Sequence, residues 1–140
     1  MPLSKILVDS SFLIALYDQD SDVYREAREL ARLYRGQFLV PQVALTEVVY
    51  LLKREAGVQG AVEFLEEFNQ SQPDLQDITV DDLKRVQAIM DQFASARFDF
   101  VDCCIMALSE RLNVTQVCTL DRRDFSIFRP KHCDYLEILP

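Results

Sequence analysis

Apolar and polar residues follow two rhythms along the chain, one typical of short buried strands and the other of amphipathic helices. Short runs rich in apolar and β-branched residues predict strands at Lys5–Val8, Phe38–Val40, Leu75–Thr79, Thr115–Thr119 and Tyr135–Leu139. Apolar residues at helical spacing predict helices at Phe12–Leu16, Val23–Arg35, Val43–Glu55, Gln59–Asn69, Asp81–Ala94 and Val101–Leu112. Because the strands alternate with helices, we expect a single α/β domain over residues 1–140, with a parallel sheet covered on both faces.

Residues that start or stop helices flank several of these segments. The acidic stretch Asp20–Asp22 is a capping signal for the helix that follows it, and Gly36 ends that helix. Pro41 suits a first helical turn, and Gly57 separates two helices. No repeat, low-complexity tract or long linker interrupts the pattern.

Composition places the chain among folded proteins. Its 140 residues are 49% apolar, which is enough to close one core. No window is long and apolar enough for a membrane span, and no signal-peptide centre precedes Asp9, so we expect a cytoplasmic protein. The net charge of −8 argues against nucleic-acid binding through bulk positive potential, but it leaves room for an acidic catalytic cluster with a local basic rim.

The four cysteines do not form a disulfide pattern. Cys103 and Cys104 are adjacent in a helical pattern, Cys118 lies in a predicted strand, and Cys133 is near the end. Reduced thiols that fill the core are the simplest interpretation. With one histidine and no CxxC pair, the chain has no zinc-site pattern.

Four acids lie where parallel strands end or where the next helices begin. Asp9 follows the first strand, Asp121 follows the strand Thr115–Thr119, and Glu47 is early in the helix after the second strand. Asp102 is in the first turn of the predicted helix Val101–Leu112, which leads through a two-residue turn into the strand Thr115–Thr119. The helix must run antiparallel to that strand, so its first turn lies at the edge where the strand ends. We therefore expect these acids to meet at the carboxyl edge of the sheet, where open α/β sheets bind ligands.

Taken singly, the first two acids have ordinary structural explanations. Asp9 can cap the following helix. Glu47 has Val43, Ala44, Tyr50 and Leu51 as helical neighbours, and a salt bridge to a distant arginine would make a carboxylate tolerable on that apolar face.

The later acids also have structural alternatives. Asp99 can cap the helix that carries Asp102 in its first turn, and Asp121 and Asp124 lie in a turn, where aspartates bond their own backbone. Crowding all of these charges would raise the pKa of one or more of the acids unless a cation lay among them. Hard oxygen ligands of this kind suit Mg²⁺ or Mn²⁺ and metal-assisted phosphodiester cleavage.

Four motifs make this reading more specific: VDSSFLIAL, LTEVVYLL, FDFVDCCIMALSERL and VCTLDRRDF, taken in chain order. Together they resemble the PIN-domain ribonucleases, and among these the VapC-type toxins of bacterial toxin–antitoxin pairs. The resemblance covers essentially the whole chain. It implies a PIN-like three-layer α/β/α fold with a parallel sheet of about five strands, often paired as a homodimer, and an antitoxin protein as partner.

Carried over by position, the resemblance implies catalytic, metal-binding acids and accessory residues. The acids are Asp9, Glu47, Asp102 and Asp121. The accessory residues are Ser10, Asp99, Thr119 and Asp124. The expected activity is that of a Mg²⁺- or Mn²⁺-dependent endoribonuclease that leaves 5′-phosphate and 3′-hydroxyl ends.

Basic residues beside the fourth acid are candidate contacts for flanking RNA phosphates: Arg122, Arg123, Arg129 and Lys131. The alternative is that they are solvated surface charges with ordinary partners.

Two other functions remain open at this point. A catalytically weak PIN-like module could bind RNA or a protein without cleaving, although all four acids are present. A phosphotransfer domain would also place an aspartate after its first strand, but the haloacid dehalogenase-like pattern needs a second aspartate where this chain has Ser11.

Overall fold

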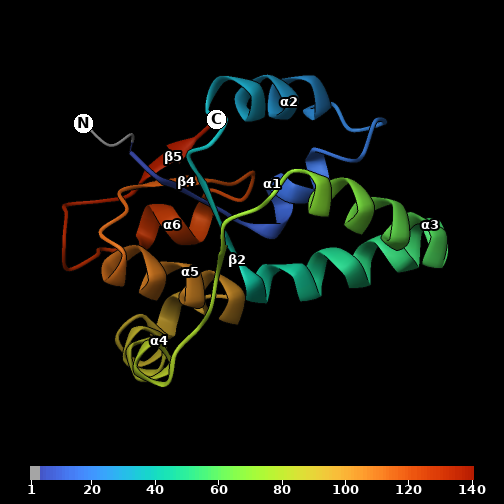
Figure 1. Ribbon diagram of the computed structural model, residues 1–140. Coiled ribbons are helices and arrows are strands. Elements are labelled where there is room, and N and C mark those ends of the chain that lie inside the picture. The colour runs from blue at the N-terminus through green and yellow to red at the C-terminus, as the bar shows by residue number, and fades with distance from the viewer. Residues whose placement is uncertain (1–3) are drawn as a thin grey trace.

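The computed structural model describes residues 4–140 and centres on a five-stranded sheet (Figure 1). The strands are β1 (Ile6–Val8), β2 (Phe38–Pro41), β3 (Leu75–Gln76), β4 (Gln116–Cys118) and β5 (Glu137–Leu139). Every pair of neighbours is parallel, in the order β3-β2-β1-β4-β5. The expected fold class is confirmed.

The strand order reverses direction between β1 and β4. From β1 the chain builds outward on one side through β2 and β3, and it returns to place β4 and β5 on the other side. Leu7 of β1 is therefore paired with Val117 of β4, although the two are remote in sequence. Parallel sheets bind ligands at such a switch point, in the crevice beyond the carboxyl ends of the strands.

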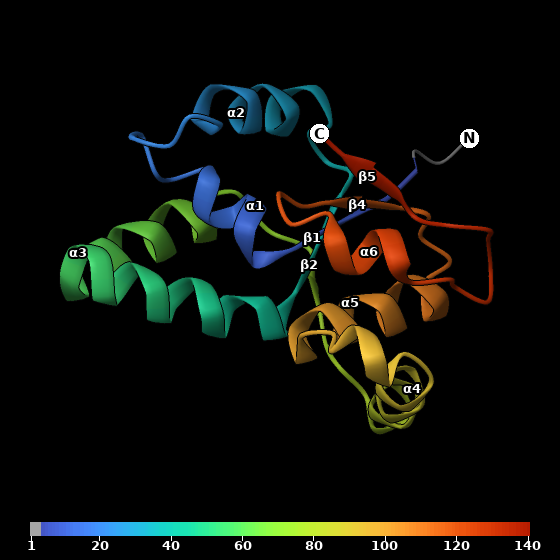
Figure 2. The same cartoon turned by 180° about the vertical axis from the view of Figure 1, so that it is seen from behind.

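Helices cover both faces of the sheet, which gives three layers (Figures 1 and 2). The helices are α1 (Ser10–Ala15), α2 (Tyr24–Leu33), α3 (Gln42–Gln70), α4 (Val80–Gln92), the 3₁₀ turn η1 (Ala94–Ala96), α5 (Phe100–Arg111) and α6 (Arg123–Ile127). Residues of α1, α2 and α3 pack with Ile6 and Val8 of β1 in one core cluster. Those of α4, α5 and α6 pack with Leu7 in the other. Over residues 4–140, no helix is long and apolar enough to cross a membrane.

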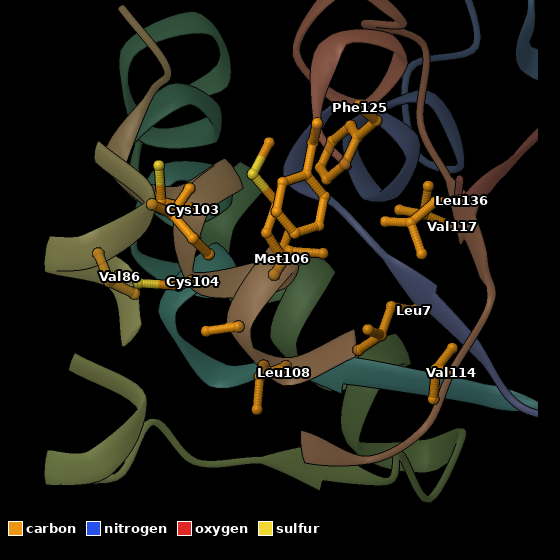
Figure 3. Packing of buried hydrophobic residues seen from close by; sticks show 14 of the residues in the cluster. Leu7, Val86, Cys103, Cys104, Met106, Leu108, Val114, Val117, Phe125 and Leu136 are labelled. Atoms are coloured by element: carbon orange, nitrogen blue, oxygen red, sulfur yellow. The ribbon is translucent and has the colours of Figure 1, made fainter. Parts of the chain in front are cut away.

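Helix α5 is the most deeply buried element of the second cluster. All of its residues from Asp102 to Ser109 are buried. Figure 3 shows Met106 of this helix facing Phe125, with Leu7 and Val117 of the sheet close by. This packing anchors the body of α5 against the strands.

The cysteines are free, and three of them fill the core as expected. Burial raises the pKa of Cys103 and of Cys118 to about 12, so both thiols stay protonated and unreactive near neutral pH. Cys133 is half-buried.

Helix α3 is two helices that meet without an intervening loop. Gly57 has φ 72° and ψ −178°, a conformation open essentially to glycine alone, and it turns the chain between the two halves. One turn later, a Cβ atom on Gly60 would lie 2.5 Å from the Cβ of Ala56. The predicted break at Gly57 is confirmed, and Gly60 lets the two halves approach closely.

Several predicted boundaries are wrong for local reasons. The strand expected over 75–79 has only two residues, because Thr79 instead caps α4 through a reciprocal bond with Asp82. The capping signal Asp20–Asp22 does not cap α2, whose N-cap is Val23 without a side-chain bond. Asp18 and Ser21 instead bond backbone N–H groups inside the preceding loop.

Two further differences concern Pro41 and the helix α6. Pro41 closes β2 and is the N-cap of α3, so it precedes the first helical turn. The short helix α6 was not among the predicted elements.

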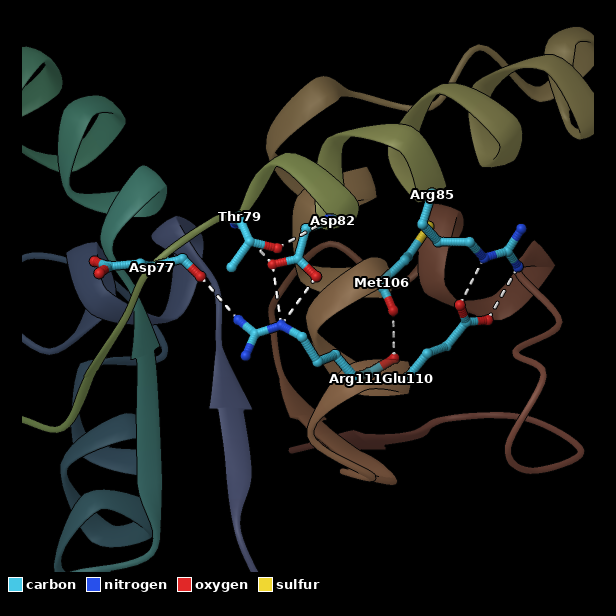
Figure 4. A network of polar contacts seen from close by, with 8 residues as sticks. Asp77, Thr79, Asp82, Arg85, Met106, Glu110 and Arg111 are labelled. Atoms are coloured by element: carbon cyan, nitrogen blue, oxygen red, sulfur yellow. Dashed lines mark hydrogen bonds and ion pairs between the residues drawn. The ribbon is translucent and has the colours of Figure 1, made fainter.

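Two arginine–carboxylate pairs join α4 to α5 (Figure 4). The Nε of Arg111 lies 3.0 Å from Oδ1 of Asp82, and its Nη2 donates to the carbonyl of Asp77 at 2.9 Å. Arg85 binds both oxygens of Glu110, at 2.6 and 3.0 Å. Burial raises the pKa of Asp82, but the bonds from Thr79 and Arg111 outweigh it, so the net shift is downward.

We expect Asp82→Asn to lower the free energy of unfolding at neutral pH by about 1–3 kcal/mol, because it breaks a largely buried ion pair. The pKa of Asp82 is lower in the folded protein, so its stabilising contribution is complete above the unfolded pKa, near 4. The contribution is lost as pH falls through the folded pKa. Denaturant unfolding of variant and wild type across this range should therefore show a stability difference that shrinks with acidity.

Asp81→Asn is the matched control, because its side chain is 91% exposed on the same helix turn. A pH-independent difference for Asp82→Asn, or an equal loss in Asp81→Asn, would contradict the expectation.

Candidate functional site

Asp9 lies directly after β1 at the switch point and is 3% exposed. It is the N-cap of α1: its Oδ1 accepts the N–H of Phe12 at 3.0 Å and the hydroxyl of Ser11 at 2.6 Å. Burial raises the pKa of Asp9, and the hydrogen bonds oppose that shift only in part. The capping explanation is thus confirmed, but capping alone does not require a carboxylate at so buried a position.

Two hydroxyl groups tie Asp9 to the end of β4. Thr119 donates to Oδ2 of Asp9 across 110 residues of sequence. Ser11 accepts the N–H of Leu120 at 2.9 Å while it donates to Asp9. The N–H of Asp121 donates to the Thr119 hydroxyl at 3.0 Å, so this threonine links the first predicted acid to the fourth.

Glu47 lies in the second turn of α3, and Ser10 donates to its Oε1 at 3.1 Å. The alternative of a salt bridge is not met, since none of the ion pairs within residues 4–140 includes Glu47. Burial raises the pKa of Glu47, and the charges of Asp99 and Asp9 raise it further. Glu47 therefore belongs to the same electrostatic group as Asp9.

Asp102 enters the site from the first turn of α5 and is 8% exposed. Asp99 is the N-cap of that helix and accepts the N–H of Val101 at 2.8 Å. Burial raises the pKa of Asp102 to about 9, and the adjoining carboxyl of Asp124, within hydrogen-bonding reach, adds to the shift together with Asp9 and Asp99. Asp102 therefore lies in a crowded, poorly solvated group of carboxyls that disfavours its charged form.

Asp121 and Asp124 flank the start of α6. Asp121 accepts the N–H of Arg123 at 3.3 Å, the turn role expected for it, and its charge also raises the pKa of Asp9. Asp124 is 6% exposed and forms an ion pair with Arg123 at 2.7 Å. Among residues 4–140 this is the one ion pair formed by any of the acids of this site.

The acids come from four separate segments of the chain and form one electrostatic group. They are Asp9, Glu47, Asp99, Asp102, Asp121 and Asp124. Three of them have their ordinary local roles, but those roles do not explain why Glu47 and Asp102 face the same crowded place. A divalent cation would relieve that crowding.

The donor set fits one class of cation better than another. All of the candidate ligands are oxygen atoms, and over residues 4–140 no three His, Cys, Asp or Glu side chains converge into a ready-made coordination group. Mg²⁺ retains several waters and needs only one or two carboxylates, whereas structural zinc needs four protein ligands. Carboxylate oxygens that lie near one another but do not form a complete coordination shell therefore fit Mg²⁺ or Mn²⁺, with water as the remaining ligands.

The arginine side chains beside the site already have hydrogen-bond partners within the protein. Arg122 donates to the carbonyl of Pro140 at 2.6 Å, and Arg129 donates to carbonyls at the end of α6, among them that of Ser126 at 2.7 Å. Arg123 is engaged with Asp124. Arg122 and Arg129 line a groove of about 580 Å³ between α6 and β5, and RNA contact at these residues and at Lys131 stays a prediction.

Ser11 is the polar residue of this site that the sequence reasoning missed. In the sequence, Ser11 is notable only as the position at which a phosphotransfer enzyme would carry a second aspartate. Its actual contacts join α1 to the loop after β4, and the one available signal was a second hydroxyl next to a helix cap.

Comparison with known proteins agrees with this architecture. The PIN domain family model matches residues 6–129. Ribonuclease VapC26 of Mycobacterium tuberculosis is 23% identical over 125 residues, which cover 89% of this chain and 93% of the relative. Such identity supports a family relationship without fixing a substrate.

Two solved structures illustrate the likeness in fold. VapC20 of Mycobacterium tuberculosis, a sarcin-ricin loop cleaving toxin, superposes with a TM-score of 0.77 at 19% identity, over 84% of this chain and 91% of its own. DNA-bound VapBC from Salmonella typhimurium gives a TM-score of 0.75 at 15% identity, over 97% of each chain.

Proposed function

The chain belongs to the PIN-domain family, and from that membership we propose that it is a metal-dependent endoribonuclease, the toxin of a toxin–antitoxin pair. The observation that carries the proposal is the group of acids at the β1–β4 switch point: Asp9, Asp102 and Asp124 are buried, and within residues 4–140 only Asp124 of this group has a cationic partner. The similarity to a ribonuclease along nearly the whole chain supports the reaction class.

The acids have distinct places in the proposed reaction. Asp9, Asp102 and Asp121 are the ligands we assign to Mg²⁺ or Mn²⁺. A divalent ion held by these residues would neutralise charge at the scissile phosphate and would make a bound water molecule more acidic. Glu47 faces the same place from α3, and we assign it to bind the ion or to orient the attacking water.

Hydroxyl groups hold these acids in position. Thr119 and Ser11 fix both oxygens of Asp9, and Ser10 fixes one oxygen of Glu47. Each hydroxyl donates a hydrogen bond, which favours the ionised carboxylate against the effect of burial. The acids are thereby kept ready for a cation, and their geometry needs little rearrangement when RNA binds.

We also propose an antitoxin as the protein partner, since solved structures of similar fold include two VapBC complexes and a toxin–antitoxin complex. An antitoxin that covers the acidic crevice, with an arginine reaching the carboxylates, would block cleavage. Homodimer formation and a cytoplasmic location remain predictions; the four free cysteines suit a reducing compartment.

The direct test is incubation of the purified protein with a structured RNA and Mg²⁺ or Mn²⁺, followed by analysis of the RNA ends. We expect internal cuts that leave 5′-phosphates and 3′-hydroxyls. RNA binding without cleavage would instead indicate the alternative, a catalytically weak binding module, and absence of both would reject the proposed substrate.

A further inference from the structure

Arg123 joins two segments that carry acids of the site. Its Nη1 lies 2.7 Å from Oδ1 of Asp124, and its Nη2 donates to the carbonyl of Ala96 at 2.6 Å. Asp124 in turn accepts the N–H of Asp99 at its Oδ2, at 3.2 Å. We propose that Arg123 is a positioning residue for the RNA cleavage inferred above: it fixes the turn before α5, and thus Asp102, and it keeps Asp124 bound to the protein.

The turn that Arg123 holds has only one short element of regular structure, the 3₁₀ helix η1. Residues 94–99 connect α4 to α5 through η1, and Arg97 has a left-handed φ of 54°, which is unfavourable for a non-glycine residue. The bonds to Ala96 and Asp99 tie this turn to α6 at two points. Because Asp99 caps α5, the place of Asp102 three residues later depends on this attachment.

The ion pair also decides how Asp124 takes part in the site. The Asp124 side chain is 8% exposed, and both of its oxygens have protein donors. A carboxylate whose charge is already offset by a guanidinium attracts a divalent cation less strongly than an unpaired one. Asp124 therefore adjoins Asp102 without acting as a metal ligand. The ligand role is left to Asp9, Asp102 and Asp121.

A rival role for Arg123 is direct contact with an RNA phosphate, since its side chain is 57% exposed. The two roles differ in kinetics. A lost phosphate contact weakens RNA binding and raises KM, whereas a displaced acid lowers kcat. The two guanidinium bonds favour the positioning role, because both terminal nitrogens are already engaged with the protein.

The test compares Arg123→Ala, Arg123→Lys and Arg25→Ala, the last being a matched loss of one positive charge at an exposed position on α2. Three measurements are made on the whole chain: steady-state kinetics with RNA, which give kcat and KM; hydrogen exchange of the Asp99 amide without metal or RNA; and the Kd for Mn²⁺ alone.

We expect Arg123→Ala to lower kcat by roughly 10- to 100-fold with little change in KM, because small displacements of reacting groups are costly. The Asp99 amide should exchange faster. Mn²⁺ should bind less tightly than in wild type, because its assigned ligand Asp102 is no longer held in place. Arg123→Lys keeps the charge but cannot span both acceptors, so it should restore kcat in part. Arg25→Ala should match wild type in all three measurements.

Two results would overturn the proposal. One is unchanged amide exchange and kcat in Arg123→Ala. The other is a rise in KM alone, with a weaker salt dependence of RNA binding, which would assign Arg123 to the RNA. If the wild-type protein cleaves no RNA, the proposed function fails by itself, and amide exchange and Mn²⁺ affinity still decide whether Arg123 holds the turn.

Discussion

Asp9→Asn is expected to lower the rate of RNA cleavage by at least roughly 100-fold, a loss comparable with removal of one preorganised charge-stabilising group. Asparagine has the shape of aspartate and can still accept the N–H of Phe12, so the cap of α1 is retained. It has no negative charge for a cation, and its amide donates where the carboxylate accepts from Ser11 or Thr119.

The same variant should remain folded. Because burial disfavours the charged form of Asp9, its neutral replacement removes a buried charge, and we expect the free energy of unfolding to be equal to or higher than that of wild type. The measurement is single-turnover cleavage together with denaturant unfolding, with Asp91→Asn, an exposed carboxylate on α4, as the control. Cleavage by Asp9→Asn within a few-fold of wild type would remove Asp9 from the reaction.

Removal of divalent metal is the second large effect that we expect. Treatment with EDTA should bring cleavage below detection, and addition of Mg²⁺ or Mn²⁺ in excess should restore it, because the crowded acids cannot by themselves offset the charge that grows on the phosphate.

Binding of the ion should also be visible without RNA. A ligand that binds only the folded state at 100 times its Kd stabilises that state by about 2.7 kcal/mol, so Mn²⁺ should raise the Tm of wild type. The rise should be much smaller in Asp9→Asn and unaltered in Asp91→Asn. Undiminished cleavage in EDTA would refute the metal role, even if the protein proved to be a ribonuclease.

The sequence was sufficient for the fold because the local patterns and the tertiary structure agree. The apolar runs around Leu7 and Val117 lack the alternation of apolar and polar residues that a strand with one exposed face shows. They are buried strands in a parallel sheet. The edge at which the acids lie then follows from geometry, since the carboxyl ends of parallel strands share one side.

What the sequence could not show is which side chains pair across the molecule. Asp82 looks like an ordinary first-turn acid of a helix, and its bond to Arg111, 29 residues away, exists only because α4 packs against α5. Arg123 likewise looks like one of several surface cations beside an acid. Only the packing of α6 against the turn before α5 reveals that its guanidinium is engaged.

Local signals also misled where two structures compete for the same polar residues. Asp18 and Ser21 bond backbone groups of their own loop, so the acidic stretch ahead of α2 forms turns and leaves Val23 as the cap. Thr79 is β-branched and reads as the end of a strand, but its hydroxyl caps α4. In both cases the deciding contact extends only two or three residues along the chain.

The reversal of strand order between β1 and β4 has a consequence for synthesis of the protein on the ribosome. Asp9 is translated early, but Thr119, to which it bonds, and Asp121 are added more than a hundred residues later. At about 5–20 residues per second, many seconds separate the two events, and the crevice cannot close in that interval. A nascent chain of this protein therefore cannot assemble the acidic crevice until almost the whole domain has emerged.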